Sequence, residues 1–188
     1  MTWACRLLLT SLATLVLLPT ARAERRRDPL NPTEVDQLRD TAQEPDERLK
    51  LYVKFARARL DLLEKARTDP KVAGRGLQVH DALQDFLDVY DELDDNVDTY
   101  ADRKDDIRKT LKLIIDADTE FQAKLRALKD SATASKQEAA QYEFLLADAL
   151  DTLDSSVQDH RQLLTEQEEL AKEKKLIKPD AQASGKRQ

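Results

Sequence analysis

The sequence has very few of the residues on which catalytic, metal-binding and disulfide chemistry most often depends. Its 188 residues include one Cys, one Met, one Trp and two His. The Cys, Met and Trp all lie in the first five residues, and the histidines, His80 and His160, are eighty positions apart. Beyond its N-terminus the chain therefore has no disulfide or thiol chemistry. Neither histidine follows a Glu by three residues, as the metal-binding units of a di-iron bundle require.

Other motifs of chemical sites are missing as well. The sequence has no G-x-S-x-G, no P-loop and no dinucleotide-binding glycine pattern. The stretch DADTEF, residues 116–121, begins like a calcium loop, but Phe121 and Ala127 stand where that loop needs Gly and Glu. We therefore predict that the protein is not an enzyme and has no cofactor.

The first 23 residues have the pattern of a secretory signal peptide. Arg6 precedes an apolar run from Leu7 to Leu18, and Ala21-Arg22-Ala23 is a small-x-small cleavage site. This pattern predicts cleavage near Ala23 and export to the periplasm or the exterior. The alternative is an uncleaved membrane anchor, although the run is shorter than the roughly 20 apolar residues that span a bilayer.

Cleavage would leave an acidic chain. The formal charge changes from −6 to −8 because two arginines leave with the signal peptide. An acidic chain without a basic patch is poorly suited to binding nucleic acid. No second apolar stretch is long enough to span a membrane. We therefore expect a protein partner and neither nucleic acid nor a transmembrane span, and leave self-association into homo-oligomers open.

Proline and glycine are absent from Leu77 to Lys178, which favours long helices. We divide the chain into a signal peptide (1–23), a disordered basic lead-in (24–30), one helical bundle domain (31–178) and a disordered tail (179–188). The first helix is short and begins with a capping box, with Asn31 as the cap, Pro32 in the first position and Glu34 as the reciprocal acceptor. A second helix follows from about 45 to 67.

The clearest pattern is a heptad seam between Val79 and Leu128, in which every third or fourth residue is apolar or aromatic. Only Lys104 and Asp118 depart from it. An unbroken heptad repeat is typical of a coiled coil, and predicts one helix of about 50 residues, roughly 75 Å long. The alternative is a break near Asp102. A last helix is expected from about 136 to 175, with His160 at the boundary of its apolar stripe.

These patterns predict an all-α fold. We expect an elongated antiparallel helical bundle or coiled coil of three long helices plus a short N-terminal helix. If the long helix breaks near Asp102, the fold becomes a four-helix bundle.

Acidic residues are concentrated between 81 and 106, a stretch that we call the acidic ribbon. Residues 88–106 alone carry nine carboxylates, and no Lys or Arg lies between Arg75 and Arg103. Antiparallel packing would place Arg57 near residue 89, so basic residues of other helices could neutralise the ribbon. We weigh three interpretations, namely a solvated helix face, an interaction surface for a basic protein and a divalent cation site. The interaction surface would use Asp81, Asp85, Asp88, Asp95 and Asp102. The cation site would use Asp88, Asp91, Glu92, Asp95 and Asp98.

The sequence thus predicts an exported, non-catalytic helical module with a structural or protein-interaction function. The alternative is an extracytoplasmic helical bundle that binds or senses cations through the acidic ribbon.

Overall fold

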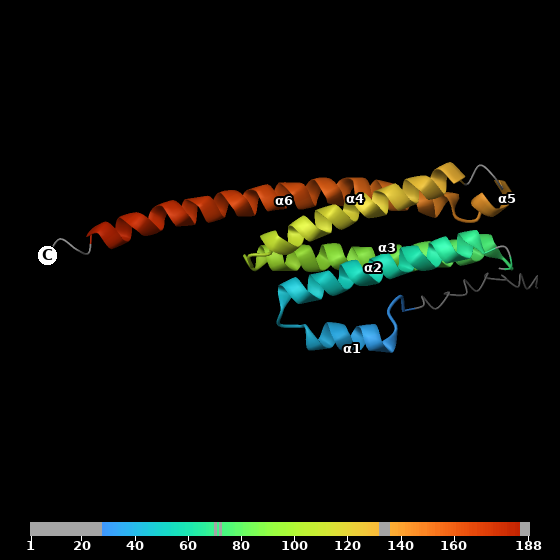
Figure 1. Cartoon of the computed structure of the whole chain (residues 1–188), viewed down its shortest axis with the longest axis horizontal. Helices are drawn as coiled ribbons and strands as arrows, with labels where there is room; N and C mark the ends of the chain where they lie inside the picture. The colour runs from blue at the N-terminus through green and yellow to red at the C-terminus, as the bar shows by residue number, and fades with distance from the viewer. Residues whose placement is uncertain (1–27, 70, 72, 132–135, 185–188) are drawn as a thin grey trace, which may run out of the picture.

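The computed structural model describes residues 28–69, 71, 73–131 and 136–184, with side chains as far as Lys175. The predicted signal peptide and Ser135, expected to cap a later helix, lie outside the described residues. The described part is all-helical and has no strand. It contains six helices, whose arrangement is drawn in Figure 1. In chain order they are α1 (Pro32–Asp40), α2 (Pro45–Thr68), α3 (Arg75–Asp102), α4 (Arg108–Ser131), α5 (Lys136–Ala139) and α6 (Glu143–Ser184).

The four long helices lie side by side in a bundle-like arrangement (Figure 1). Helix α2 packs mainly on α3, and α4 packs mainly on α6. The two pairs meet where α2 contacts α4 and where α3 contacts α6, over shorter surfaces. Within the part of the chain that the structure describes, no helix is both long and apolar enough to cross a membrane.

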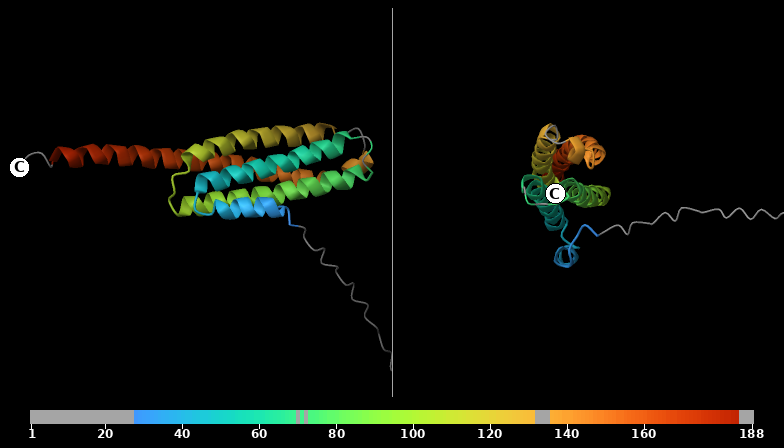
Figure 2. Two further views of the ribbon diagram at one scale, coloured as in Figure 1. Left: turned by 60° about the horizontal axis from the view of Figure 1, so that its bottom comes forward. Right: turned by 90° about the vertical axis from the view of Figure 1, so that its right-hand side faces the viewer.

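Helix α1 begins as the sequence predicts. The side chain of Asn31 accepts a hydrogen bond from the Glu34 N–H at 3.0 Å, and the Glu34 carboxylate accepts one from the Asn31 N–H at 2.9 Å. Pro32 occupies the start of the helix. The predicted capping box is therefore confirmed. Figure 2 shows α1 on the outside of the other helices.

A buried ion pair attaches α1 to α2. Nη2 of Arg59 lies 2.5 Å from Oε2 of Glu34, and both side chains are about nine-tenths buried. Arg59 also donates to the carbonyl of Pro29 from Nε at 3.1 Å. Pro29 belongs to the segment 24–30 that the sequence predicts to be disordered, so the end of that segment is bound to α2.

The prediction of one helix of about 50 residues is wrong, and the alternative break near Asp102 is present. Helix α3 ends at Asp102 and α4 begins at Arg108. Lys104 has a positive φ of 61°. The N–H of Asp105 donates to the carbonyl of Tyr100 at 3.0 Å, and that of Lys104 to Ala101 at 2.9 Å. This is the Schellman pattern, which ends a helix at a left-handed residue.

The C-terminal part of the chain also differs from the expected single helix over 136–175. Helix α5 ends at Ala139, and α6 begins at Glu143 and continues to Ser184, into the segment 179–188 predicted as a disordered tail. The turn between α5 and α6 lies against the start of α3. A Cβ atom at Gly76 would come within 2.9 Å of the carbonyl oxygen of Glu138, so only glycine permits this close approach.

The heptad seam lies in the core, together with apolar residues of α2 and α6, although its helix is interrupted. All thirteen apolar and aromatic seam positions between Val79 and Leu128 are buried. The rings of Phe86, Tyr90 and Phe121 pack together, and the centroids of Phe86 and Phe121 are 5.5 Å apart at an edge-to-face angle of 84°. Of the two polar seam positions, Lys104 is exposed in the turn that follows α3, whereas Asp118 is fully buried.

Candidate functional site: a buried histidine–carboxylate cluster

The fully buried Asp118 meets His160, which lies on the apolar stripe of α6. Oδ2 of Asp118 is 2.9 Å from Nδ1 of His160. The other ring nitrogen, Nε2, is 3.3 Å from Oδ1 of Asp94 on α3. The His160 side chain is only 4% exposed. One imidazole ring from α6 is therefore held between carboxylates of α3 and α4.

Two hydroxyl groups complete this cluster, which we call the His160 cluster. The hydroxyl of Tyr90 donates to Oδ1 of Asp118 at 2.7 Å, and that of Ser156 donates to Oδ2 of Asp94 at 2.5 Å. Tyr90 and Asp94 are four residues apart on α3, as are Ser156 and His160 on α6. Residues at this spacing share a helix face, so α3 and α6 each contribute two members to the cluster, and α4 contributes Asp118.

The electrostatics of the cluster favour a charged histidine. Burial alone lowers the pKa of His160, but the hydrogen bonds and negative charges of Asp118 and Asp94 outweigh it and raise that pKa to about 9. Burial raises the pKa of Tyr90 above its ordinary value, and the charge of Asp118 adds to this effect. At neutral pH the ring of His160 is therefore an imidazolium that faces Asp118 and Asp94, with Tyr90 as a neutral donor.

This arrangement holds charge rather than activating a nucleophile. In a nucleophilic site, the hydroxyl of a Ser donates to a neutral histidine nitrogen that takes its proton. Here the Ser156 hydroxyl donates to Asp94, and both nitrogens of His160 already face carboxylate oxygens. The geometry fits a buried salt bridge that orients three helices.

A small cavity of about 150 Å³ adjoins the cluster between α3 and α6. Asp94, Asp98, Ser156, Asp159 and His160 supply its polar wall. Oδ1 of Asp94 is buried and makes no well-formed hydrogen bond, and Nε2 of His160 lies 3.3 Å from it. The pKa of Asp98 is raised, first by burial and then by the charges of Asp94 and Asp102. Negative charge is thus crowded on this side of α3.

The structure places the predicted acidic ribbon on α3 and on the turn that follows it. Two of the predicted site residues, Asp85 and Asp88, are half-buried, and Asp88 accepts a hydrogen bond from Gln84 at 2.9 Å. The remaining ones are exposed, namely Asp81, Asp91, Glu92, Asp95, Asp98 and Asp102. Among the described residues, no group of three or more His, Cys, Asp or Glu side chains is placed to hold a metal ion. Of these eight predicted site residues, only Asp98 lines the cavity at the His160 cluster. The two uses predicted for the ribbon, protein contact and cation binding, stay predictions.

Basic residues at the α2–α4 boundary form ion pairs with the neighbouring helix. Arg57, which antiparallel packing of α2 on α3 would place near residue 89, pairs with Glu120 on α4 at 2.8 Å. Nearby, Lys124 on α4 pairs with Asp61 on α2 at 3.0 Å. The α2–α4 boundary thus carries exposed ion pairs, whereas the α3–α6 boundary carries the buried His160 cluster.

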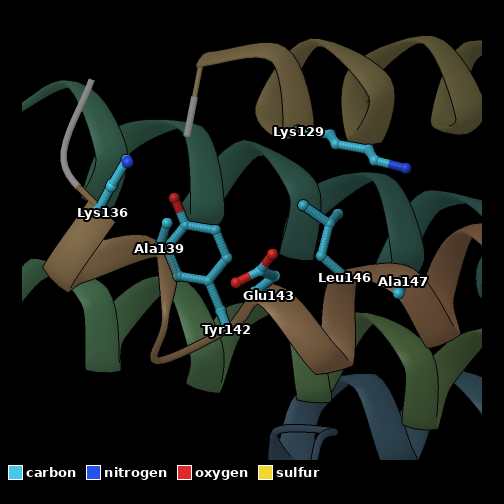
Figure 3. A pocket seen from close by; sticks show the side chains of 7 residues that line it. All are labelled: Lys129, Lys136, Ala139, Tyr142, Glu143, Leu146 and Ala147. Atoms are coloured by element: carbon cyan, nitrogen blue, oxygen red, sulfur yellow. The ribbon is translucent and has the colours of Figure 1, made fainter. Parts of the chain in front are cut away.

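A second cavity, of about 590 Å³, lies between the end of α4 and the start of α6 (Figure 3). Tyr142 and Leu146 form its apolar floor, and Lys129, Lys136 and Glu143 stand around it (Figure 3). Its charged groups have both signs and do not converge on one point, in contrast to the His160 cluster.

The sequence contained a signal for the His160 cluster. Asp118 is one of two polar residues on an otherwise apolar seam, and His160 interrupts an apolar stripe. Two isolated polar residues on core faces predict a buried pair, because buried polar groups need partners. Treating His160 alone, as a boundary residue, missed this pairing.

Comparisons of the chain with protein-family models, curated proteins and solved structures found no match.

Proposed function

We propose that this chain is an exported, non-catalytic helical module that acts by contacting another protein, with an elongated antiparallel bundle as its scaffold. The observation that carries the proposal is the length of α6. In Figures 1 and 2 its C-terminal part extends well past the end of α2, α3 and α4. A helix that leaves its own bundle offers its whole circumference to a partner.

The point at which α6 leaves the bundle is marked by named contacts. The side chain of Gln167 binds the backbone of the α3–α4 turn, and Glu168 pairs with Lys112 at 2.9 Å. Two residues later Leu170 is 55% exposed, and all side chains from Lys172 to Lys175 are exposed. The side chains between Leu170 and Lys175 are therefore largely uncovered, and we call the part of α6 from Leu170 onward the α6 extension.

Physical chemistry supports a partner for the α6 extension. Helices in proteins owe most of their stability to packing of an apolar face, and short isolated helices are marginal in water. A partner that covered Leu170 would supply this packing. The basic residues Lys172, Lys174 and Lys175 lie beside it and would favour contact with an acidic surface, whereas the acidic ribbon on α3 would favour a basic one.

The test is photo-crosslinking in living cells. A photoreactive residue replaces Leu170 in one variant and Leu113, a 39% exposed leucine on α4, in the control. The proposal expects a discrete protein adduct from position 170 and none from position 113. Equal labelling at both positions, or no adduct at 170, would overturn it.

N-terminal sequencing of protein from outside the cytoplasm tests export, since the sequence should begin at Glu24. An intact Met1 in a membrane fraction would favour the anchor.

Cation binding by the acidic ribbon is the second candidate. It is favoured by the crowding of Asp94, Asp98 and Asp102, because burial and then the charges of Asp94 and Asp102 raise the pKa of Asp98. A bound cation would relieve that repulsion. This candidate requires ligands from outside α3, because the described side chains do not assemble a metal-binding group by themselves.

A further inference from the structure

Both ring nitrogens of His160 face carboxylate oxygens, and this geometry has a chemical consequence. A neutral imidazole has one N–H donor and one lone-pair acceptor, whereas an imidazolium has two donors. A carboxylate offers only lone pairs when ionised. If His160 were neutral, the lone pair of one nitrogen would point at the lone pairs of a buried carboxylate. Both carboxylates face an N–H group only when His160 carries two protons.

The position of His160 gives these protons a structural role. The bundle consists of two extensive helix pairs, α2 with α3 and α4 with α6, which meet over shorter surfaces. His160 on α6 joins Asp118 within its own pair and Asp94 in the other pair. The proton on Nε2 therefore lies on the boundary between the two pairs, beside the cavity of about 150 Å³.

We propose that His160 is a proton-dependent link between the two helix pairs, and that loss of the Nε2 proton loosens α3 from α6 while leaving α4 attached.

The asymmetry of the cluster determines which proton leaves first. Asp118 is fully buried, lies 2.9 Å from Nδ1 and is held in place by the Tyr90 hydroxyl. Asp94 is 28% exposed and lies 3.3 Å from Nε2. The shorter, better buried bond keeps its proton, because an unpaired buried charge at Asp118 would cost more than one at Asp94. The neutral ring therefore keeps its hydrogen bond to α4 and repels α3.

The other polar groups around the ring act in the same direction. From α3, Tyr90, Asp94 and Asp98 act on the cluster, and from α4, Asp118 does. On α6 itself, Ser156 binds Asp94, and Asp159 lines the cavity. Once Nε2 is deprotonated, the charges of Asp94 and Asp98 lose the cation that offsets them, and the two carboxylates repel each other across the cavity wall.

The direction of the pH effect follows from the raised pKa of His160, about 9. A group whose folded-state pKa is raised stabilises the fold fully below its unfolded pKa of about 6.5. That stabilisation declines as pH rises further and is lost above about 9. At neutral pH the link is closed.

The protonation state can be observed directly by nitrogen NMR on the full chain labelled in histidine. The chain has only two histidines, and His80, which is more than one-third exposed, is the internal reference. We expect His160 to show two protonated nitrogens at pH 7 and to become neutral near pH 9, with the remaining proton on Nδ1. A neutral ring at pH 7, or a remaining proton on Nε2, would overturn the proposal.

Opening of the boundary is measured by distances between spin labels in the full chain with Cys5 replaced by Ser. One pair joins Thr99 on α3 to Arg161 on α6, and the other joins Asp116 on α4 to the same Arg161; all three positions are exposed. Between pH 7 and pH 10 the first distance should lengthen or broaden, and the second should stay unchanged. Equal responses of the two distances contradict the proposal.

A conservative variant separates proton linkage from simple packing. In Asp94→Asn the side-chain amide donates to an unprotonated Nε2, so a neutral ring is tolerated. We expect the His160 midpoint to fall by at least one pH unit and the Thr99–Arg161 distance to become independent of pH. Asp95→Asn removes the same charge from an exposed position on α3 and should leave both unchanged. If Asp94→Asn behaves as the parent does, the proposal is wrong.

Discussion

Gln167 on α6 binds the backbone of Ile107 in the α3–α4 turn, through a hydrogen bond from the Ile107 N–H to Oε1 at 3.2 Å. The same amide donates from Nε2 to the carbonyl of Asp105 at 3.1 Å. One side chain therefore satisfies a donor and an acceptor of a turn that contains no glycine. The turn and the part of α6 just before the α6 extension are fixed to each other by these two bonds.

Gln167→Ala should destabilise the protein by about 1–3 kcal/mol, because two part-buried backbone groups lose their partner. The measurement is urea unfolding followed by circular dichroism. Gln162→Ala is the matched control, because Gln162 is exposed and bonds only to Glu166 on its own helix. Similar midpoints for the two variants would show that the Gln167 contact adds nothing to stability.

Lys104→Gly should stabilise the protein by about 1 kcal/mol. Lys104 occupies a left-handed conformation, which is costly for residues with a Cβ atom and free of strain for glycine. Lys109→Gly, at an exposed position in the first turn of α4, should destabilise by a similar amount, because glycine is a poor helix former. Thermal unfolding of both variants decides this point. A loss of stability for Lys104→Gly would mean that the helix continues through residue 104.

These residues show how much the sequence could predict. The seam positions are buried because a heptad repeat places them on one face whether or not the helix is continuous. The break was offered only as the alternative because its left-handed residue is Lys104, and helix ends of this kind are usually marked by Gly or Asn. Asp118 and His160 are 42 positions apart in the sequence and lie on different helices. Their contact depends on how far α4 and α6 are shifted along each other, and the apolar spacing within either helix does not determine that shift. The antiparallel count placed Arg57 opposite α3 but could not show its ion pair with Glu120 on α4, because that pair depends on how the two helix pairs meet.

Leu93→Asp should cost several kcal/mol, because Leu93 is fully buried and the new carboxylate would have no partner there. Asp95→Ala, two residues further along α3 and exposed, should change stability by no more than about 0.5 kcal/mol. Denaturant midpoints at pH 7 provide the comparison. Equal effects would mean that the assigned helix face of α3 is wrong.

Arg59→Ala should destabilise the protein by about 3–5 kcal/mol, because it leaves the carboxylate of Glu34 buried without its cation. Arg39→Ala, which removes one partner of the fully surface-exposed pair with Asp36, should have little effect. The readout is the midpoint of urea unfolding at pH 7. If both variants have the same midpoint, the ion pair between α1 and α2 is not formed in solution.

The ion pair between Glu34 and Arg59 also predicts that the stability of the protein depends on pH in the acidic range. Burial raises the pKa of Glu34, but hydrogen bonds from Arg59 and from the Asn31 N–H outweigh it and lower that pKa below 4.5. A lowered folded-state pKa means that the stabilisation is complete above pH 4.5 and is lost as pH falls through the folded value. The difference in stability between parent and Arg59→Ala should therefore shrink between pH 5 and pH 3. A difference that stayed constant over this range would contradict the ionised pair.

Calcium titration decides between the two candidate functions. Acidic residues seven apart along α3, such as Asp88 and Asp95, are separated by roughly 10 Å of helix, too far to share one ion, and calcium needs six to eight oxygens around it. We therefore expect calorimetry at physiological salt to show only weak heat, since screening removes diffuse attraction there. Changing Asp91, Asp95 and Asp98 together to Asn should make no difference to that heat. The control changes Asp116, Asp148 and Asp151, which are exposed on α4 and α6 and carry the same charge. A saturable site of micromolar affinity that is lost in the first triple variant and kept in the second would establish cation binding by the acidic ribbon. Both variants lose three carboxylates, but only the first loses them from α3.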